Sequence, residues 1–354
     1  MQKGKIKKNI IQILILLALM CLTYYIIMRD KDIDQVWSVL AGASGIWLMV
    51  SALSMVLYIF CGGWAIRVLM KGRGKKVSIW QCFKYSFIEF YFSAITPSSS
   101  GGQPVQVFYM SKDGYDVADS GVCIVTITIL YKGALLVIAA IAFALELGFI
   151  SGAIANIWPL AILGLFLNLG LIAILVMLLF SKKMIGTIAK FFIRFLGKIR
   201  IVKDTDRLLD KCDMTVVKYH ACAKFLASHK PQVIKAFGVL SLQRLSLMLI
   251  PFFVYKSFGL SGYSLVQILA AQCLLNICVD MMPLPGAVGI SETVFFILFT
   301  PIFLEQNITT AVLLSRGISF YVVVIVAGLV VCGIQLADII RNNISVRREK
   351  KENQ

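Results

Sequence analysis

Two stretches of this chain place proline and glycine inside hydrophobic segments, one in each half of the sequence. The first, 96–104, reads TPSSSGGQP, and the second, 283–292, reads PLPGAVGISE. In the hydrocarbon of a bilayer every backbone N–H and C=O needs a partner within the protein, so broken helices occur only where protein buries them or where they line a water-filled cavity. Paired breaks in two halves therefore indicate a transport site.

The composition assigns the chain to a membrane. Hydrophobic residues make up 59% of the 354 residues and charged residues 15%, against about 25% charged in ordinary soluble domains. Six runs reach the roughly 20 apolar residues that a spanning helix needs. They are 10–28, 43–70, 118–145, 157–180, 236–255 and 308–337. We therefore predict an all-α polytopic membrane protein that forms one domain over residues 1–354.

The first run, 10–28, has a second interpretation as the core of a signal peptide. Four lysines precede it, at positions 3, 5, 7 and 8. It is longer than the usual core of about 7–15 residues, and no small-residue cleavage site follows it. We interpret it as a retained first helix.

The net charge of +17 comes from basic clusters between the hydrophobic runs. They lie in the N-terminal tail and in 71–76, 182–235 and 341–351, whereas the intervening loops are acidic or nearly neutral. The positive-inside rule places these clusters and both termini in the cytoplasm, as expected of a multi-pass protein of the cell membrane. Because orientation explains the charge, we expect no nucleic-acid partner. A basic face also attracts anionic lipid, by about 1 kcal/mol per residue.

With the cytoplasmic loops fixed, each interrupted segment is predicted to enter and leave on one face. Segment 79–110 then forms a re-entrant helical hairpin that enters from the cytoplasm. Segment 264–303 forms a second hairpin that enters from outside. Such hairpins are typical of an inverted repeat, with the substrate site between their tips. The alternative that remains open is eight kinked spans.

The predicted halves are 1–180 and 236–337. Between them, segment 181–235 interleaves lysine and arginine with phenylalanine and leucine. This pattern predicts an amphipathic helix at the cytoplasmic interface. The stretch 338–354 is expected to form a basic cytoplasmic tail.

Six ionisable residues fall at predicted membrane depth. An ionisable residue there costs at least ~2.5 kcal/mol and marks a functional candidate. The carboxylates are Glu89, Asp280 and Glu292, and the cations are Lys132, Arg244 and Arg316. Two interpretations stay open, because the charges could pair to hold the halves together or could line a polar cavity. Such a cavity suits a phospholipid headgroup, since helix N-termini and glycine-rich turns present N–H groups to phosphate and the carboxylates could receive an amine.

At these residues the chain resembles the lysylphosphatidylglycerol synthase transmembrane region, also called the flippase-like domain family. Stretch 96–106 resembles the family's proline, small residues, double glycine and following polar stretch. Stretch 283–292 resembles its PxPGGxGxxE element, with Ala287 in place of a glycine, and 316–321 resembles the arginine-to-tyrosine segment of its last helix. The resemblance covers nearly the whole chain. It departs in the third span, where many relatives show Asp-Arg and this chain has Tyr131-Lys132. Lysine keeps the positive charge, but it cannot bind a phosphate in the bidentate way that arginine does.

Carried over residue by residue, the resemblance adds tip and last-helix residues to the charged set. The complete predicted lipid-binding and translocation site is Glu89, Pro97, Gly101, Gly102, Lys132, Arg244, Asp280, Pro285, Gly286, Gly289, Glu292, Arg316 and Tyr321. We expect no catalytic residue, no metal and no cofactor. No nucleotide-binding motif is present, so transport would be passive or ion-coupled.

The resemblance implies two functions. The first is a lipid translocase for an anionic or aminoacylated phospholipid, such as phosphatidylglycerol or its aminoacyl ester, or for a related lipid. The alternative is phosphatidylglycerol lysyltransferase, or its membrane subunit, which is implicated in resistance to cationic antimicrobial peptides. Full-length synthases continue into a soluble domain that uses lysyl-tRNA, whereas this sequence stops at Gln354 after the last helix. We therefore expect a separately encoded transferase in the second case. A third possible function is that of a membrane scaffold for another protein. The chain could also form a homo-oligomer.

Overall fold

The computed structural model describes residues 33–155, 157–198 and 205–352, and all regular structure in these ranges is helical. Six helical segments of this part of the chain are long and apolar enough to cross a membrane. They are Gly45–Gly72, Val117–Leu145, Trp158–Phe180, Lys230–Ser257, Pro285–Phe303 and Glu305–Ala337. The predicted class, an all-α polytopic membrane protein, is confirmed. Five of these segments match predicted spans, and the predicted span 10–28 lies outside the described residues.

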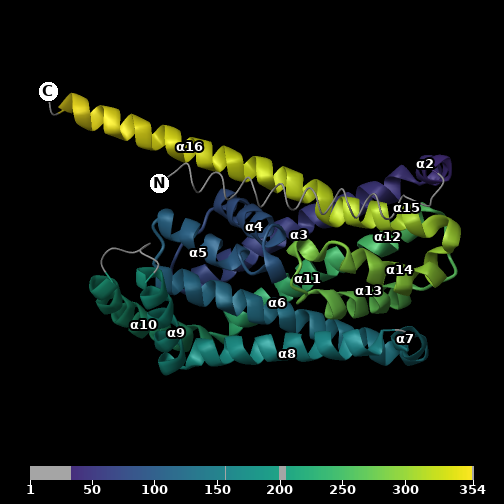
Figure 1. Ribbon diagram of the computed structural model, residues 1–354, viewed down its shortest axis with the longest axis horizontal. Helices are drawn as coiled ribbons and strands as arrows, with labels where there is room; N and C mark the ends of the chain where they lie inside the picture. Colours follow the sequence, from purple (N-terminus) through teal and green to yellow (C-terminus); the bar gives the residue numbers. More distant parts are fainter. Residues whose placement is uncertain (1–32, 156, 199–204, 353–354) are drawn as a thin grey trace.

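The long helices run along one direction of the molecule (Figure 1). Three are uninterrupted, namely α3 (Gly45–Gly72), α6 (Val117–Leu145) and α8 (Trp158–Phe180). They are apolar on all sides, as expected of helices that contact lipid or other spans all round.

Two spans are broken. One consists of α11 (Lys230–Met248) and α12 (Ile250–Ser257), which meet next to Pro251. Proline has no N–H to donate to the carbonyl four residues earlier, so the helix breaks there. The last span consists of α15 (Glu305–Arg316), the π-helical turn η3 (Gly317–Tyr321) and α16 (Val322–Glu352). The predicted tail after 337 is thus helical as far as Glu352.

The interrupted segments are helix–turn–helix units. The first consists of α4 (Ile79–Ala94), η1 (Pro97–Ser99) and α5 (Gly102–Lys112). The second consists of α13 (Leu265–Val279), η2 (Pro285–Ala287) and α14 (Ile290–Phe303). A serine and a glutamine three residues later form a capping box at the start of both α4 and α13, which bonds N–H groups that the first turn leaves free.

We call residues 95–101 the first tip and residues 280–289 the second tip. In both, a proline is followed by two residues with left-handed φ, at 52° and 53° for Ser98 and Ser99 and at 58° and 51° for Gly286 and Ala287. The same interval along the chain separates η1 from η2, α5 from α14, and α6 from α15. The tips contact each other, with α4 and α5 toward one end of the molecule and α13 and α14 toward the other (Figure 1). Their orientation in a bilayer stays a prediction.

The linker differs from the predicted single interfacial helix. It forms two helices that pack against each other, α9 (Lys182–Lys198) and α10 (Thr205–Ser228). Helix α10 also packs on α6, and it buries Tyr219, Cys222 and Leu226 in the core. Arg73 reaches across this contact, with Nη2 lying 2.8 Å from Oδ1 of Asp119 and 3.0 Å from the Cys222 sulfur. Polar contacts of Arg73 therefore link α10 to α6. The amphipathic periodicity of the linker alone does not predict this contact.

Two short helices complete the described part. They are α2 (Ile33–Gly42), which contacts α15, and α7 (Leu147–Ile154), which lies in the predicted weakly charged loop between α6 and α8.

A glycine fixes how closely α8 approaches α13. A Cβ at Gly164 would lie 2.0 Å from the Ile277 carbonyl oxygen. Gly164→Ala is therefore expected to destabilise the protein by about 1–3 kcal/mol, the usual cost of overpacking. Gly170→Ala on the same helix is the matched control, because nothing lies within 4 Å of its Cβ and alanine favours a helix by up to about 1 kcal/mol. Thermal unfolding in detergent measures both, and equal melting temperatures would contradict the tight contact.

Candidate functional site

A cavity of about 620 Å³ lies where the two tips meet. Side chains from both hairpins line it, together with residues of α3, α6, α8, α11, α12, α15 and η3. Charged and polar groups share this lining with aliphatic ones. The cavity therefore brings charged and polar side chains together with apolar ones inside a body whose outer surface is largely apolar.

The first charged group on the wall is a cluster around Asp280. This residue follows the last turn of α13, and its Oδ2 accepts hydrogen bonds from Arg244 Nη2 and, at 3.2 Å, from Lys132 Nζ. Arg244 Nη1 also donates to the Tyr131 hydroxyl at 2.6 Å, and that hydroxyl lies 3.4 Å from the hydroxyl of Tyr58. Two cations thus share one carboxylate, so the cluster carries one excess positive charge.

The second charged group holds the second tip to the last span. Glu292 Oε1 accepts hydrogen bonds from Arg316 Nε and from the Tyr321 hydroxyl, both at 2.8 Å, and Glu292 Oε2 accepts from the Gly289 N–H at 2.7 Å. Arg316 Nη2 donates to the Gly286 carbonyl at 3.0 Å. Arg316 directly precedes the π-helical turn η3 and Tyr321 is its last residue, and such turns recur at functional sites. This pair is electrically neutral.

Glu89 is the third charged group, and no described cation pairs with it. It projects from α4 into the cavity, and its Oε1 accepts a hydrogen bond from Ser93 Oγ at 3.0 Å. A carboxylate at membrane depth without a cation is costly. Glu89 therefore places on the cavity wall a carboxyl group whose charge no described cation compensates.

The thirteen predicted residues fall into two sets. Those that line the cavity are Glu89, Lys132, Arg244, Asp280, Gly286 and Arg316. Those that build and support the tips behind the lining are Pro97, Gly101, Gly102, Pro285, Gly289, Glu292 and Tyr321. Glu292 is only 2% exposed. Both open interpretations of the charges thus apply, because pairs form and a polar cavity lies beside them.

Glycines at the tips permit close approach of other groups. A Cβ at Gly102 would lie 2.6 Å from the Glu89 carbonyl oxygen, and a Cβ at Gly286 would lie 2.1 Å from the Phe320 ring. Gly286 also holds a φ of 58°, which a residue without Cβ adopts at no steric cost.

Sequence reasoning missed several uncharged polar residues on the wall. They are Tyr58, Gln103, Gln106, Tyr131, Gln243, Gln272 and Asn276. Amides inside apolar runs were a signal that could have found three of them, Gln243, Gln272 and Asn276. Asn276 Oδ1 accepts from Gln272 Nε2 at 3.2 Å, whereas Gln272 Oε1 and Asn276 Nδ2 have no partner among the described residues. Buried polar atoms are normally bonded, so these atoms suit a polar occupant.

Arg316 offers a direct test of the second charged group. Arg316→Ala leaves the buried Glu292 carboxylate without its cation, which is expected to cost about 3–5 kcal/mol. Arg316→Lys keeps the charge and should cost less. Arg194→Ala, at an exposed position of α9, is the control and should stay within about 0.5 kcal/mol of the wild type. Thermal unfolding in detergent measures all three, and an unchanged melting temperature in Arg316→Ala would disprove the structural role of the pair.

Comparison with known proteins places this site in a family. Residues 9–327 match the family described as lysylphosphatidylglycerol synthase TM region. A UPF0104 membrane protein of Archaeoglobus fulgidus is 24% identical over 279 residues, which cover 75% of this chain and 80% of the relative. The match takes in both hairpins, the cavity and the charged groups as far as Tyr321. The chain belongs to the lysylphosphatidylglycerol synthase transmembrane region family.

Proposed function

We propose that this protein translocates a phospholipid between leaflets by passing the headgroup through the cavity between the two tips. The observation that carries the proposal is the cavity itself, where an excess cation and a carboxyl group without a cation partner among the described residues lie inside apolar spans. Its volume of about 620 Å³ falls in the range of about 300–1,000 Å³ that is usual for small-molecule sites. Since charges at membrane depth are costly and are typically found in substrate pathways, their gathering around one cavity supports transport.

The charge distribution indicates how a headgroup would bind. The Asp280 cluster, with Lys132 and Arg244, has one excess positive charge and suits a phosphate, since a guanidinium fork matches phosphate geometry. Arg244 Nε is buried without a partner among the described residues. Glu89 suits an ammonium group. An anionic phospholipid would use the first group, and an aminoacylated phospholipid would use both.

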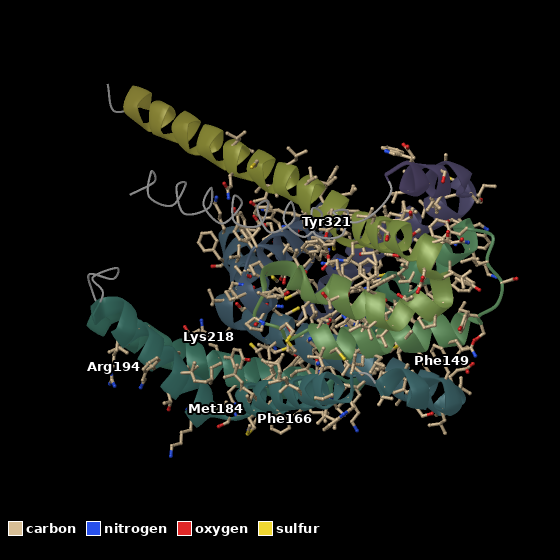
Figure 2. The ribbon with its side chains drawn as sticks, turned by 45° about the vertical axis from the view of Figure 1, so that its right-hand side comes forward. Phe149, Phe166, Met184, Arg194, Lys218 and Tyr321 are labelled. Atoms are coloured by element: carbon tan, nitrogen blue, oxygen red, sulfur yellow. The ribbon has the colours of Figure 1, made fainter. Side chains whose placement is uncertain are left out.

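The proposed setting is the cell membrane, with both termini in the cytoplasm. The exposed basic side chains of α9 and α10, among them Arg194 and Lys218, project from one end of the helical body (Figure 2). Cytoplasmic segments carry such an excess of lysine and arginine. Neither the cavity nor the tips offer a phosphate-binding loop for a nucleotide, so the proposed transport is passive or ion-coupled.

Reconstitution tests the proposal. Purified protein in liposomes without ATP is expected to expose fluorescently labelled phosphatidylglycerol and lysyl-phosphatidylglycerol of the inner leaflet to an external quencher. Because the cavity gives the headgroup a polar path, the exposed fraction should rise with protein per vesicle. Labelled lipid as protected as in empty vesicles, for both headgroups, would refute the proposal.

Glu89 should determine the preference for an amine. Glu89→Gln removes the charge and keeps the hydrogen bond with Ser93. It is expected to slow the amine-bearing lipid about tenfold, a barrier change of about 1.4 kcal/mol, and to slow phosphatidylglycerol less. Glu305→Gln, at an exposed position of α15, is the control. Quenching measures the translocation rates of both lipids. If Glu89→Gln slows both equally, Glu89 does not bind the amine of the headgroup.

A further inference from the structure

The cavity has an aliphatic side that the charged groups do not explain. On this side the lining consists of Val125 and Ile127 from α6, Leu171 and Leu175 from α8, and Met281 from the second tip. None of these side chains can bind a headgroup. They form an apolar wall that continues directly from the Asp280 cluster.

The path of α8 explains why this wall exists. Gly164, Asn168, Leu171 and Leu175 follow one another at helical spacing, so they lie on one face of α8. Gly164 and Asn168 close this face against α13, since Asn168 Nδ2 donates to the Gly164 carbonyl at 2.8 Å and to the Ile277 carbonyl at 3.4 Å. Helix α13 ends at Val279.

Beyond that end the same face of α8 borders the cavity. Leu171 and Leu175 lie one and two turns farther along α8 than Asn168, and both line the cavity. The second tip lines the cavity with Met281 and Leu284, and Leu284 is 38% exposed. The cavity is not enclosed, and we use the term opening for the stretch of its wall formed by α8, α6 and the second tip past the end of α13.

The outer surface of α8 beside the opening is apolar and exposed. It includes Ile162, Phe166, Leu169 and Ile174, which are 49–72% exposed. In Figure 2, Phe166 lies at the edge of the body along α8, on the side opposite to Tyr321. Such a surface in a membrane protein contacts acyl chains, so lipid lies against the outer side of the helix whose inner side lines the cavity.

We propose that this opening, framed by Leu171, Leu175 and Met281, is an acyl-chain portal: the chains of the lipid pass between α8 and the second tip while the headgroup occupies the cavity. The inference rests on the proposed translocase function and adds the place where the substrate's hydrocarbon lies. A phospholipid is charged at one end and aliphatic at the other, as this cavity is. Chains that stay in hydrocarbon avoid the unfavourable exposure of apolar surface to water.

Narrowing the portal tests the inference. Wild type and Leu171→Trp/Leu175→Trp are reconstituted in liposomes with fluorescently labelled phosphatidylglycerol, and translocation is followed by quenching. The double variant is expected to be about tenfold slower or more. Leu165→Trp/Leu169→Trp adds the same bulk to two exposed positions of α8 and should keep the wild-type rate. Soluble glycerophosphoglycerol should raise the melting temperature of the double variant as much as that of the wild type, because the charged groups are untouched.

Widening the portal supplies an independent readout. Leu171→Ala/Leu175→Ala should translocate lipid at the wild-type rate or faster. If the two leucines only pack the helices, the same variant should be slower. A slower rate therefore overturns the inference, even if the tryptophan variant fails to fold. An unchanged rate in the tryptophan variant also overturns it. Absence of translocation in the wild type would overturn the proposed function and, with it, the portal.

Discussion

Backbone groups left unpaired at two broken helices are the constraint on which the rest of this structure depends. At membrane depth such groups need partners within the protein or water in a cavity, and here side chains supply several of these partners. At the first tip Thr96 Oγ1 accepts from the Gly101 N–H at 2.9 Å, and Ser93 Oγ donates to the Ser99 carbonyl at 3.3 Å. At the second tip Glu292 takes the Gly289 N–H and Arg316 the Gly286 carbonyl. Of the charges for which the sequence left both pairing and a polar cavity open, Glu292 and Arg316 are thus needed by the fold itself.

The charged groups of the candidate site differ in whether they bond the backbone of a tip. The Glu292 and Arg316 pair is neutral and nearly buried, and it fixes the second tip against the last span. The Asp280 cluster carries an excess cation, Glu89 has no cation partner among the described residues, and both face the cavity. The proposed headgroup binding therefore falls on charged residues that make no hydrogen bond to the backbone of the tips. The neutral pair provides the rigid support that such chemistry requires.

Hydropathy and charge were sufficient to predict the fold class and five spans, because the bilayer imposes length and polarity on every helix. The breaks at Pro97 and Pro285 were equally visible, since proline and glycine are rare where helices must continue. The partners of each charge were not visible, because pairing depends on which faces of distant helices meet. The packing of α10 on α6 could not be predicted for the same reason, because Arg73 and Cys222 are far apart in sequence.

The two tips share one backbone shape but differ in their freedom to change sequence. At the second tip Gly286 combines a left-handed φ with contact against Phe320, so any side chain there meets both backbone strain and a ring. At the first tip Ser98 and Ser99 already carry side chains at the same φ values. Descendants of this chain can therefore vary the serines of the first tip and keep the turn, whereas position 286 is confined to glycine as long as Phe320 stays in place.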